Sequence, residues 1–226
     1  MRWIPDTTGR FGLRPHFERT EIDQQCERLV TEFLRSRGAV RWPLSTDELT
    51  VLVEQNVSEL DVYADLDDDG QDVEGVTELL PTGEVRIRVH ARLGGDPRME
   101  NRLRMTVAHE LGHVRFHMPL WVEEQVGGKS SGPGRVVGCT PDSMLASDSV
   151  DWMEWQAAYA AGAILMPATP LRRVVARCFD DPGDAMALPE DSPAGRDLQT
   201  VVQRTFAVSR PAARVRLLQH GYLTES

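Results

Sequence analysis

At 226 residues, of which 41% are hydrophobic and 27% charged, the chain has the size and composition of a globular protein with one sizeable domain. No apolar run approaches the ~18 residues that cross a bilayer, and the first residues lack the apolar segment of a secretory signal, so we expect no membrane association. The net charge of −10 argues against indiscriminate binding of nucleic acid by the whole surface. It does not exclude a local basic patch.

Cysteine usage favours a reducing compartment. Cys26, Cys139 and Cys178 are odd in number, widely spaced and outside any C-x-x-C pair. A disulfide framework or a zinc ribbon needs paired cysteines, so both are disfavoured. We therefore expect a cytoplasmic protein.

Two amphipathic helices are predicted near the N-terminus. Apolar residues recur at helical spacing over residues 20–37, with Thr20 as a candidate N-cap and Gly38 as a candidate stop. A second helix is predicted to begin near Ser45, because Glu48 follows at the spacing of a capping box.

Strand-like segments follow at residues 60–66, 74–81 and 84–93. Within the last, apolar residues alternate with Arg and His over residues 85–90, which is the pattern of a half-buried strand. An exposed edge of this strand could bind an extended peptide by β-addition. The alternative is an ordinary edge strand that its arginines protect.

The segment M-T-V-A-H-E-L-G-H-V-R-F-H, residues 105–117, holds three of the six histidines. On a helix, His109 and His113 lie one turn apart on the same face, with Glu110 beside the first. This is the H-E-x-x-H pattern of zinc peptidases, in which the histidines bind Zn²⁺ and the glutamate takes a proton from water.

A pH-sensitive or merely solvated histidine face is the alternative reading of this helix. Apolar residues also lie on two of its sides, so it is predicted to be buried, and buried histidines need partners that a metal would supply. The main apolar stripe consists of Leu103, Val107, Leu111, Val114 and Met118.

A peptidase zinc site needs a third protein ligand. His117 would lie a turn too far along the helix, so it is interpreted as an ordinary histidine near the helix end. Glu154 is the better candidate, because it opens an alanine-rich helix over residues 150–166 that could approach closely. Glu123 and Glu124 compete, and an exposed glutamate in a first helical turn is the ordinary alternative for Glu154.

The remainder of the chain is predicted to alternate loops and helices. Residues 125–149 are rich in Gly, Ser and Pro and are expected to form a long loop, and residues 180–195 a linker. Between them a further helix is predicted over residues 169–179, and the last thirty residues are predicted to be helical.

The C-terminal stretch is basic. Arg210, Arg214 and Arg216 lie in a segment without acidic residues and are candidates for docking a partner. Phe206-x-Val208-Ser209 followed by a helix is similar to the second half of a helix-turn-helix. A basic helix pair packed on the rest of the chain is favoured over DNA binding, because no complete first helix with the usual turn is evident.

Two segments together resemble the ImmA/IrrE family of metallopeptidases: E-N-R-L-R-M-T-V-A-H-E-L-G-H-V-R-F-H and E-W-Q-A-A-Y-A-A-G-A-I-L-M-P. The second is similar to the family pattern E-x-x-A-N-x-F-A-x-x-L-L-M-P, with Glu154 at its glutamate and Ala157 at its alanine. Ala158 and Ala160 depart from the usual Asn and Phe, which bears on substrate contacts and local packing. The resemblance runs from about residue 20 to the end.

The resemblance implies an α+β, zincin-like fold with a small antiparallel sheet over the active-site helix. The peptidase domain would span residues 20–175, preceded by an extension over 1–19 and followed by a linker and small helical region over 176–226. It also implies one Zn²⁺ per chain, bound by His109, His113 and Glu154. Members of the family cleave helix-turn-helix repressors of mobile elements or stress responses.

The predicted function is thus zinc-dependent cleavage of a helix-turn-helix repressor, with Glu110 as general base. Tyr159, His90 and His117 are candidates for stabilising the oxyanion or contacting substrate. The main alternative is a non-catalytic regulator that binds a repressor or DNA and keeps a structural or idle metal site. The peptidase partner of a toxin–antitoxin pair is a third reading.

Overall fold

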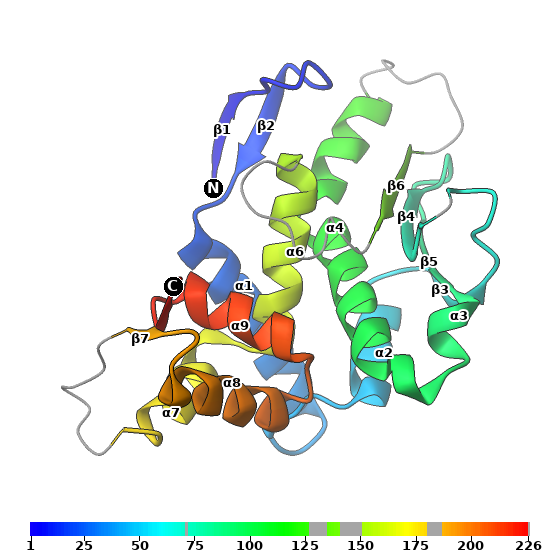
Figure 1. Ribbon diagram of the computed structural model, residues 1–226. Helices are drawn as coiled ribbons and strands as arrows, with labels where there is room; N and C mark the ends of the chain where they lie inside the picture. The colour runs from blue at the N-terminus through cyan, green and yellow to red at the C-terminus, as the bar shows by residue number, and fades with distance from the viewer. Residues whose placement is uncertain (71, 127–134, 141–150, 180–186, 226) are drawn as a thin grey trace.

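The structure is a computed structural model that describes every residue except 71, 127–134, 141–150, 180–186 and 226 (Figure 1). Its helices are α1 (Arg19–Ser36), α2 (Thr46–Glu54), α3 (Ala91–Gly94), the 3-10 helix η1 (Pro97–Met99), α4 (Glu100–Val126), α6 (Trp152–Leu165), α7 (Ala168–Ala176), α8 (Pro193–Phe206) and α9 (Arg210–Gln219). Its strands are β1 (Arg2–Pro5), β2 (Leu13–His16), β3 (Glu59–Ala64), β4 (Gly75–Leu79), β5 (Val85–His90), β6 (Arg135–Cys139), β7 (Leu188–Pro189) and β8 (Leu223–Thr224). The fold is α+β.

Local signals in the sequence account for the first two helices. The side chain of Ser45 accepts a hydrogen bond from the Glu48 N–H, and the capping box at the start of α2 is complete, as predicted. Helix α1 also begins in a capping box, but its N-cap is Glu18 rather than the predicted Thr20. Gly38 follows the end of α1 at φ 103°, a left-handed conformation that favours glycine.

The central sheet has the order β3-β5-β4-β6. Strand β4 pairs antiparallel with β5 and β6, whereas β3 pairs parallel with β5, so the sheet is mixed and the predicted antiparallel sheet is wrong in this respect. Strand β5 lies inside the sheet because a tight turn folds β4 onto one of its sides and β3 takes the other. The predicted exposed edge at residues 85–89 therefore does not exist.

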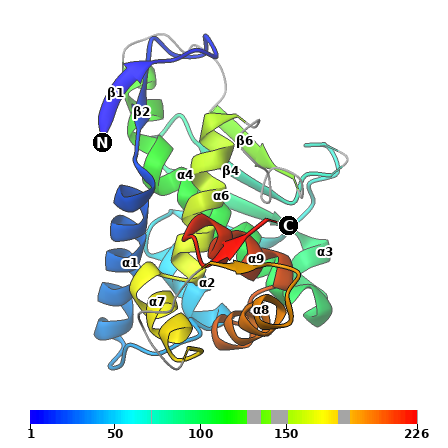
Figure 2. The same cartoon turned by 60° about the vertical axis from the view of Figure 1, so that its left-hand side comes forward.

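Helix α4 is the central element of the fold. It packs against strands β4, β5 and β6 on one side and against α6 on another, while α1 packs on α6 (Figures 1 and 2). Val107, Leu111 and Phe116 of α4 are buried in the main core, which agrees with the prediction of a helix covered on two sides. The helix continues beyond Pro119 to Val126, so His117 does not lie at its end.

The C-terminal helices belong to the same core. Phe206 of α8 and Leu217 of α9 are buried together with residues of α1 and α6. A buried ion pair connects Arg216 of α9 with Asp23 of α1 at 2.5 Å. Figure 2 shows α8 and α9 beside α7, α2 and the lower part of α6.

The N-terminal hairpin of β1 and β2 lies against the start of α6 and the second half of α4 (Figure 1). Phe11 packs edge-on against Trp152, and Phe17 packs edge-on against Phe116. Residues predicted to form an extension are thus in contact with the helices that carry the candidate ligands. None of the helices that the structure describes is both long and apolar enough to cross a membrane.

Candidate metal centre

The two histidines of the H-E-x-x-H segment face the same point. His109 and His113 are fully buried on α4, and their Nε2 atoms lie 3.0 Å apart. The helical spacing of four residues produces this arrangement, as the sequence predicted.

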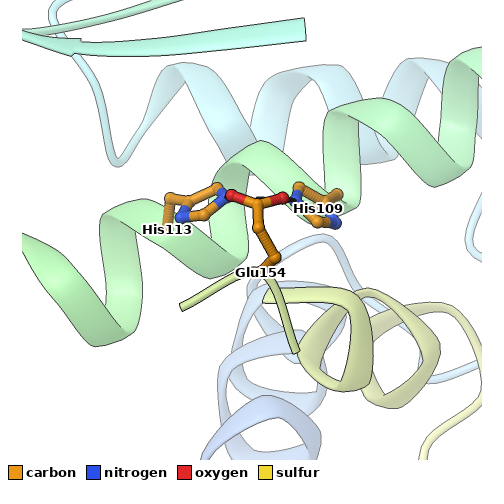
Figure 3. Close-up of side chains that lie close together, drawn as sticks. All are labelled: His109, His113 and Glu154. Atoms are coloured by element: carbon orange, nitrogen blue, oxygen red, sulfur yellow. Dashed lines mark hydrogen bonds and ion pairs between the residues drawn. The ribbon is translucent and has the colours of Figure 1, made fainter. Parts of the chain in front are cut away.

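Glu154 comes to the same point from α6. Its Oε2 lies 3.2 Å from Nε2 of His109, and its Oε1 lies 3.3 Å from Nε2 of His113. Figure 3 shows the carboxylate between the two imidazoles, with the three side chains pointing toward one another from two helices. The first turn of α6 is held in place by Asp151, whose side chain accepts a hydrogen bond from the Met153 N–H.

Contacts within this group shift the pKa of Glu154 and of His113. Burial raises the pKa of Glu154, but the hydrogen bonds from His109 and His113 outweigh it and hold the pKa below its usual range. Burial lowers the pKa of His113, but the hydrogen bond to Glu154 outweighs it, and the net shift is upward. The Glu154 carboxylate is therefore ionised, and it favours the protonated form of His113.

The donor set and its spacing fit a small divalent cation. The ligand atoms of His109, His113 and Glu154 all lie within 4.8 Å of one another. A tetrahedral ion with bonds of about 2.0–2.1 Å separates its ligand atoms by about 3.3 Å, close to the three distances above. Two imidazoles and one carboxylate leave a fourth position open, which is the arrangement of catalytic rather than structural zinc sites.

Glu110 lies on the sheet side of the same helix and is fully buried. Its Oε2 accepts a hydrogen bond of 2.6 Å from the Thr77 hydroxyl of β4. Its Oε1 has no hydrogen-bond partner among the described residues. A buried carboxylate oxygen without a partner is costly, and a water at the open metal position would satisfy it.

Gly75 of β4 lacks a side chain, which leaves space for the carboxylate of Glu110. A Cβ on Gly75 would lie 2.6 Å from Oε1 of Glu110 and 2.8 Å from Cγ2 of Thr106. The contacts of Glu110 therefore depend on a glycine and a threonine that lie two residues apart on one face of β4.

Cys139 is a member of the site that the sequence did not reveal. It is the last residue of β6, and its sulfur lies within 4.8 Å of candidate ligand atoms of His109 and Glu110. Burial and the charge of Glu110 raise the pKa of this thiol well above its usual value. Residues 125–149, which include Cys139, were predicted to form a long loop. Of these, only 125, 126 and 135–140 are described, and 135–139 form strand β6 instead. The pair Val136-Val137 was the one local signal for a strand.

The three oxyanion candidates have other partners. The Tyr159 hydroxyl donates a hydrogen bond to Asp23 at 3.0 Å. His90 lies on β5 with Nε2 3.2 Å from Asp67. His117 is fully buried, and its Nδ1 lies 2.9 Å from Nδ1 of His113, so it is not the helix-end histidine that the sequence predicted.

The three candidate docking arginines differ in accessibility. Arg210 is exposed, whereas Arg214 is half-buried and pairs with Glu190 at 2.5 Å. Arg216 is 1% exposed and pairs with Asp23, so its prediction as a docking residue is wrong. The side chains of Glu123 and Glu124, the competing third ligands, lie outside the part that the structure describes.

The sequence matches neither a protein-family model nor a curated protein.

Proposed function

We propose that this protein is a zinc-dependent endopeptidase of zincin-like fold, similar to the ImmA/IrrE metallopeptidases, that cleaves a helix-turn-helix repressor. The observation that carries the proposal is the convergence of His109, His113 and Glu154 from two helices, with the buried carboxylate of Glu110 beside them. A structural zinc site needs no such base. The mixed sheet packed on α4 supports a zincin-like arrangement.

His109, His113 and Glu154 would hold the zinc ion through two nitrogens and a carboxylate. When bound there, zinc supplies Lewis-acid polarisation of the scissile carbonyl and makes water more acidic. The helices keep these side chains in place before any ligand arrives, because α4 and α6 pack directly on each other.

Glu110 would act as general base and then as general acid. Its Oε1, which has no partner among the described residues, takes a proton from the attacking water, whose oxygen forms a bond to the scissile carbon. As the C–N bond breaks, Glu110 returns that proton to the leaving amine. The Thr77 hydroxyl holds Oε2, so the carboxylate keeps one orientation through both proton transfers.

Substrate would bind in an extended form along β6. Strand β6 is an outer strand of the sheet, with no neighbour on its outer side among the described residues. Its last residue, Cys139, adjoins Glu110, so a peptide added to β6 would pass the site. β-Addition accepts any extended segment, and selectivity would come from docking of the folded repressor, with Arg210 and Arg214 as candidate contacts.

The test combines metal analysis with cleavage of a helix-turn-helix repressor, sought first among the genes that neighbour this one. Wild-type protein is expected to carry about one zinc per chain, and Glu110→Gln to keep zinc but lose cleavage, because the base is not a ligand. His109→Ala and Glu154→Ala are expected to lose zinc, whereas Glu123→Ala and Glu124→Ala serve as controls that keep it.

The fragments, mapped by mass spectrometry, are expected to show one cut in an exposed loop or linker of the repressor, and casein to stay intact. Cleavage by Glu110→Gln at the wild-type rate would refute the mechanism. Rapid digestion of casein at many sites would refute a dedicated protease. Zinc and repressor binding without cleavage would support the non-catalytic regulator instead.

A further inference from the structure

A line of buried hydrogen bonds leads from His113 away from the metal centre. Nδ1 of His113 lies 2.9 Å from Nδ1 of His117, whose Nε2 lies 3.1 Å from Oε1 of Gln156 on α6. The Gln156 amide nitrogen donates to the carbonyl oxygen of Pro15, on β2, at 3.2 Å. The exposed fractions of the three side chains are 0%, 0% and 1%.

The carbonyl at the end of this line fixes the direction of every hydrogen bond. A carbonyl oxygen accepts only, so the Gln156 amide group donates to Pro15 and turns its own oxygen toward His117. Nε2–H of His117 must donate to that oxygen. A neutral imidazole carries one N–H, so Nδ1 of His117 holds a lone pair and accepts from Nδ1–H of His113. Nε2 of His113 is then the atom that faces His109 and Glu154.

The two candidate histidine ligands differ in how far hydrogen bonds and neighbouring rings hold them in place. Nδ1 of His109 has no hydrogen-bond partner in the part of the chain that the structure describes. His113 is supported through its ring nitrogen and along its face, since the Trp121 ring stacks on it with centroids 6.4 Å apart. The ring of His117 is held by Trp152, which meets it edge-on at 5.5 Å. The tautomer and ring plane of His113 are thus set by the surrounding protein.

We propose that His117 and Gln156 are positioning residues for the metal centre, which hold His113 in the tautomer whose Nε2 can bind a metal. This inference rests on the proposed zinc site. It adds that metal binding depends on the N-terminal hairpin, since the carbonyl oxygen that anchors Gln156 belongs to Pro15. Loss of a hydrogen-bond partner behind a histidine ligand typically weakens metal affinity 10- to 100-fold.

Matched substitutions separate the hydrogen bonds from packing. His117→Asn can place an amide oxygen where Nδ1 of His117 lies and so keeps an acceptor for His113, whereas His117→Leu fills similar space without one. Gln156→Leu removes both the acceptor for Nε2–H of His117 and the donor to the Pro15 carbonyl. Zinc affinity is measured by competition with a chromophoric chelator, and ligand geometry by the visible absorption of the Co²⁺-loaded protein.

We expect His117→Leu and Gln156→Leu to bind zinc about 10- to 100-fold more weakly than wild type, and His117→Asn to stay within a few-fold of it. Melting curves in excess chelator test whether each metal-free variant is folded. Wild-type affinity in His117→Leu would overturn the proposal. Equal losses in the Leu and Asn variants would also overturn it, because they would assign His117 a packing role.

Long-range ¹H–¹⁵N NMR of histidine-labelled, metal-free protein reads the tautomers directly. The proposal requires His117 to carry its proton on Nε2 in the wild type and a mixed population in Gln156→Leu. A proton on Nδ1 of His117 in the wild type would overturn it without reference to zinc. Absence of repressor cleavage by zinc-loaded wild type would count against the proposed function alone, because these measurements concern binding and protonation.

Discussion

Gly112 of α4 lies directly against Ala157 of α6. A Cβ added to Gly112 would lie 3.0 Å from both Cα and the carbonyl oxygen of Ala157. In sequence, Gly112 lies between the two histidines of the H-E-x-x-H segment, and Ala157 follows Glu154, whose carboxylate reaches both histidines, by about one helical turn. The separation of the two helices, and with it the geometry of the metal centre, therefore depends on the missing side chain.

Gly112→Ala is expected to weaken zinc affinity at least tenfold and to lower the free energy of unfolding by about 1–2 kcal/mol. Overpacking against backbone costs about 1–3 kcal/mol, which exceeds the gain of up to ~1 kcal/mol from replacing a helical glycine with alanine. Chelator competition and thermal unfolding measure the two effects.

Gly162→Ala is the matched control on α6. Its added Cβ would meet Arg216 Cδ at 3.5 Å, an ordinary contact, so stability is expected to hold or rise while zinc affinity is unchanged. If Gly112→Ala behaved like Gly162→Ala, the helix separation would not control the site.

Thr77→Val tests how Glu110 is held. Valine keeps the shape of threonine but removes the hydroxyl that donates to Oε2 of Glu110 at 2.6 Å. We expect repressor cleavage to slow about 10- to 100-fold with zinc content unchanged. Without the hydroxyl, the Glu110 carboxylate can rotate, so its Oε1 lies less often within hydrogen-bond distance of the attacking water. Thr77→Ser should recover most of the rate. Wild-type turnover in Thr77→Val would show that the hydroxyl does not position Glu110.

The local part of the fold and of the site could be predicted from the sequence. Helix spacing alone places His109 beside His113, and the capping box at Ser45 marks the start of α2. The small side chains of α6 favoured Glu154 over Glu123 and Glu124, because close packing of two helices has a compositional signature, and the family resemblance decided among the three. Each of these signals lies within one or two turns of helix.

Features that depend on distant pairing could not be predicted in this way. The interior position of β5 follows from which strands become its neighbours, and Cys139 reaches the site because β6 pairs with β4. His117 is interpreted differently once its partner Gln156, on another helix, is known. A one-dimensional pattern carries no information on such pairs.

Arg216→Met is expected to destabilise the fold rather than to weaken partner docking. Arg216 donates to Asp23 and to the Met166 carbonyl oxygen from a position that is 1% exposed. Removal of Arg216 leaves the buried Asp23 carboxylate without its cationic partner, although the Tyr159 hydroxyl still donates to it, and such a loss typically costs about 3–5 kcal/mol. Denaturant unfolding measures the loss.

Arg210→Met is the control on the same helix. Arg210 is exposed, and the change should alter the free energy of unfolding by less than about 0.5 kcal/mol. Equal stability of the two variants would contradict the structural role of Arg216. Docking of a repressor is therefore tested with Arg210 and Arg214, because a variant of Arg216 would confuse unfolding with lost contact.

His220 is predicted to make stability depend on pH. Burial and the positive charge of Arg216 lower its pKa to about 4, although Asp23, at 3.7 Å from its Nε2, acts in the opposite direction. The ring also stacks on Tyr222. In the unfolded chain a histidine titrates near 6.5, so between these two values the unfolded state binds more protons than the folded state.

Stability contributed by neutral His220 is therefore present above about pH 6.5 and is lost as the pH falls toward 4. The loss should approach roughly 2 kcal/mol, because solvent screening at this half-buried ring reduces the ~1.4 kcal/mol that corresponds to one pKa unit. His220→Asn removes this titration, so the difference in free energy of unfolding between wild type and variant should change across that interval. Urea unfolding at several pH values, in chelator to exclude metal effects, measures the difference. A difference that is constant from pH 7 to pH 4 would mean that His220 is protonated as readily in the folded chain as in the unfolded one.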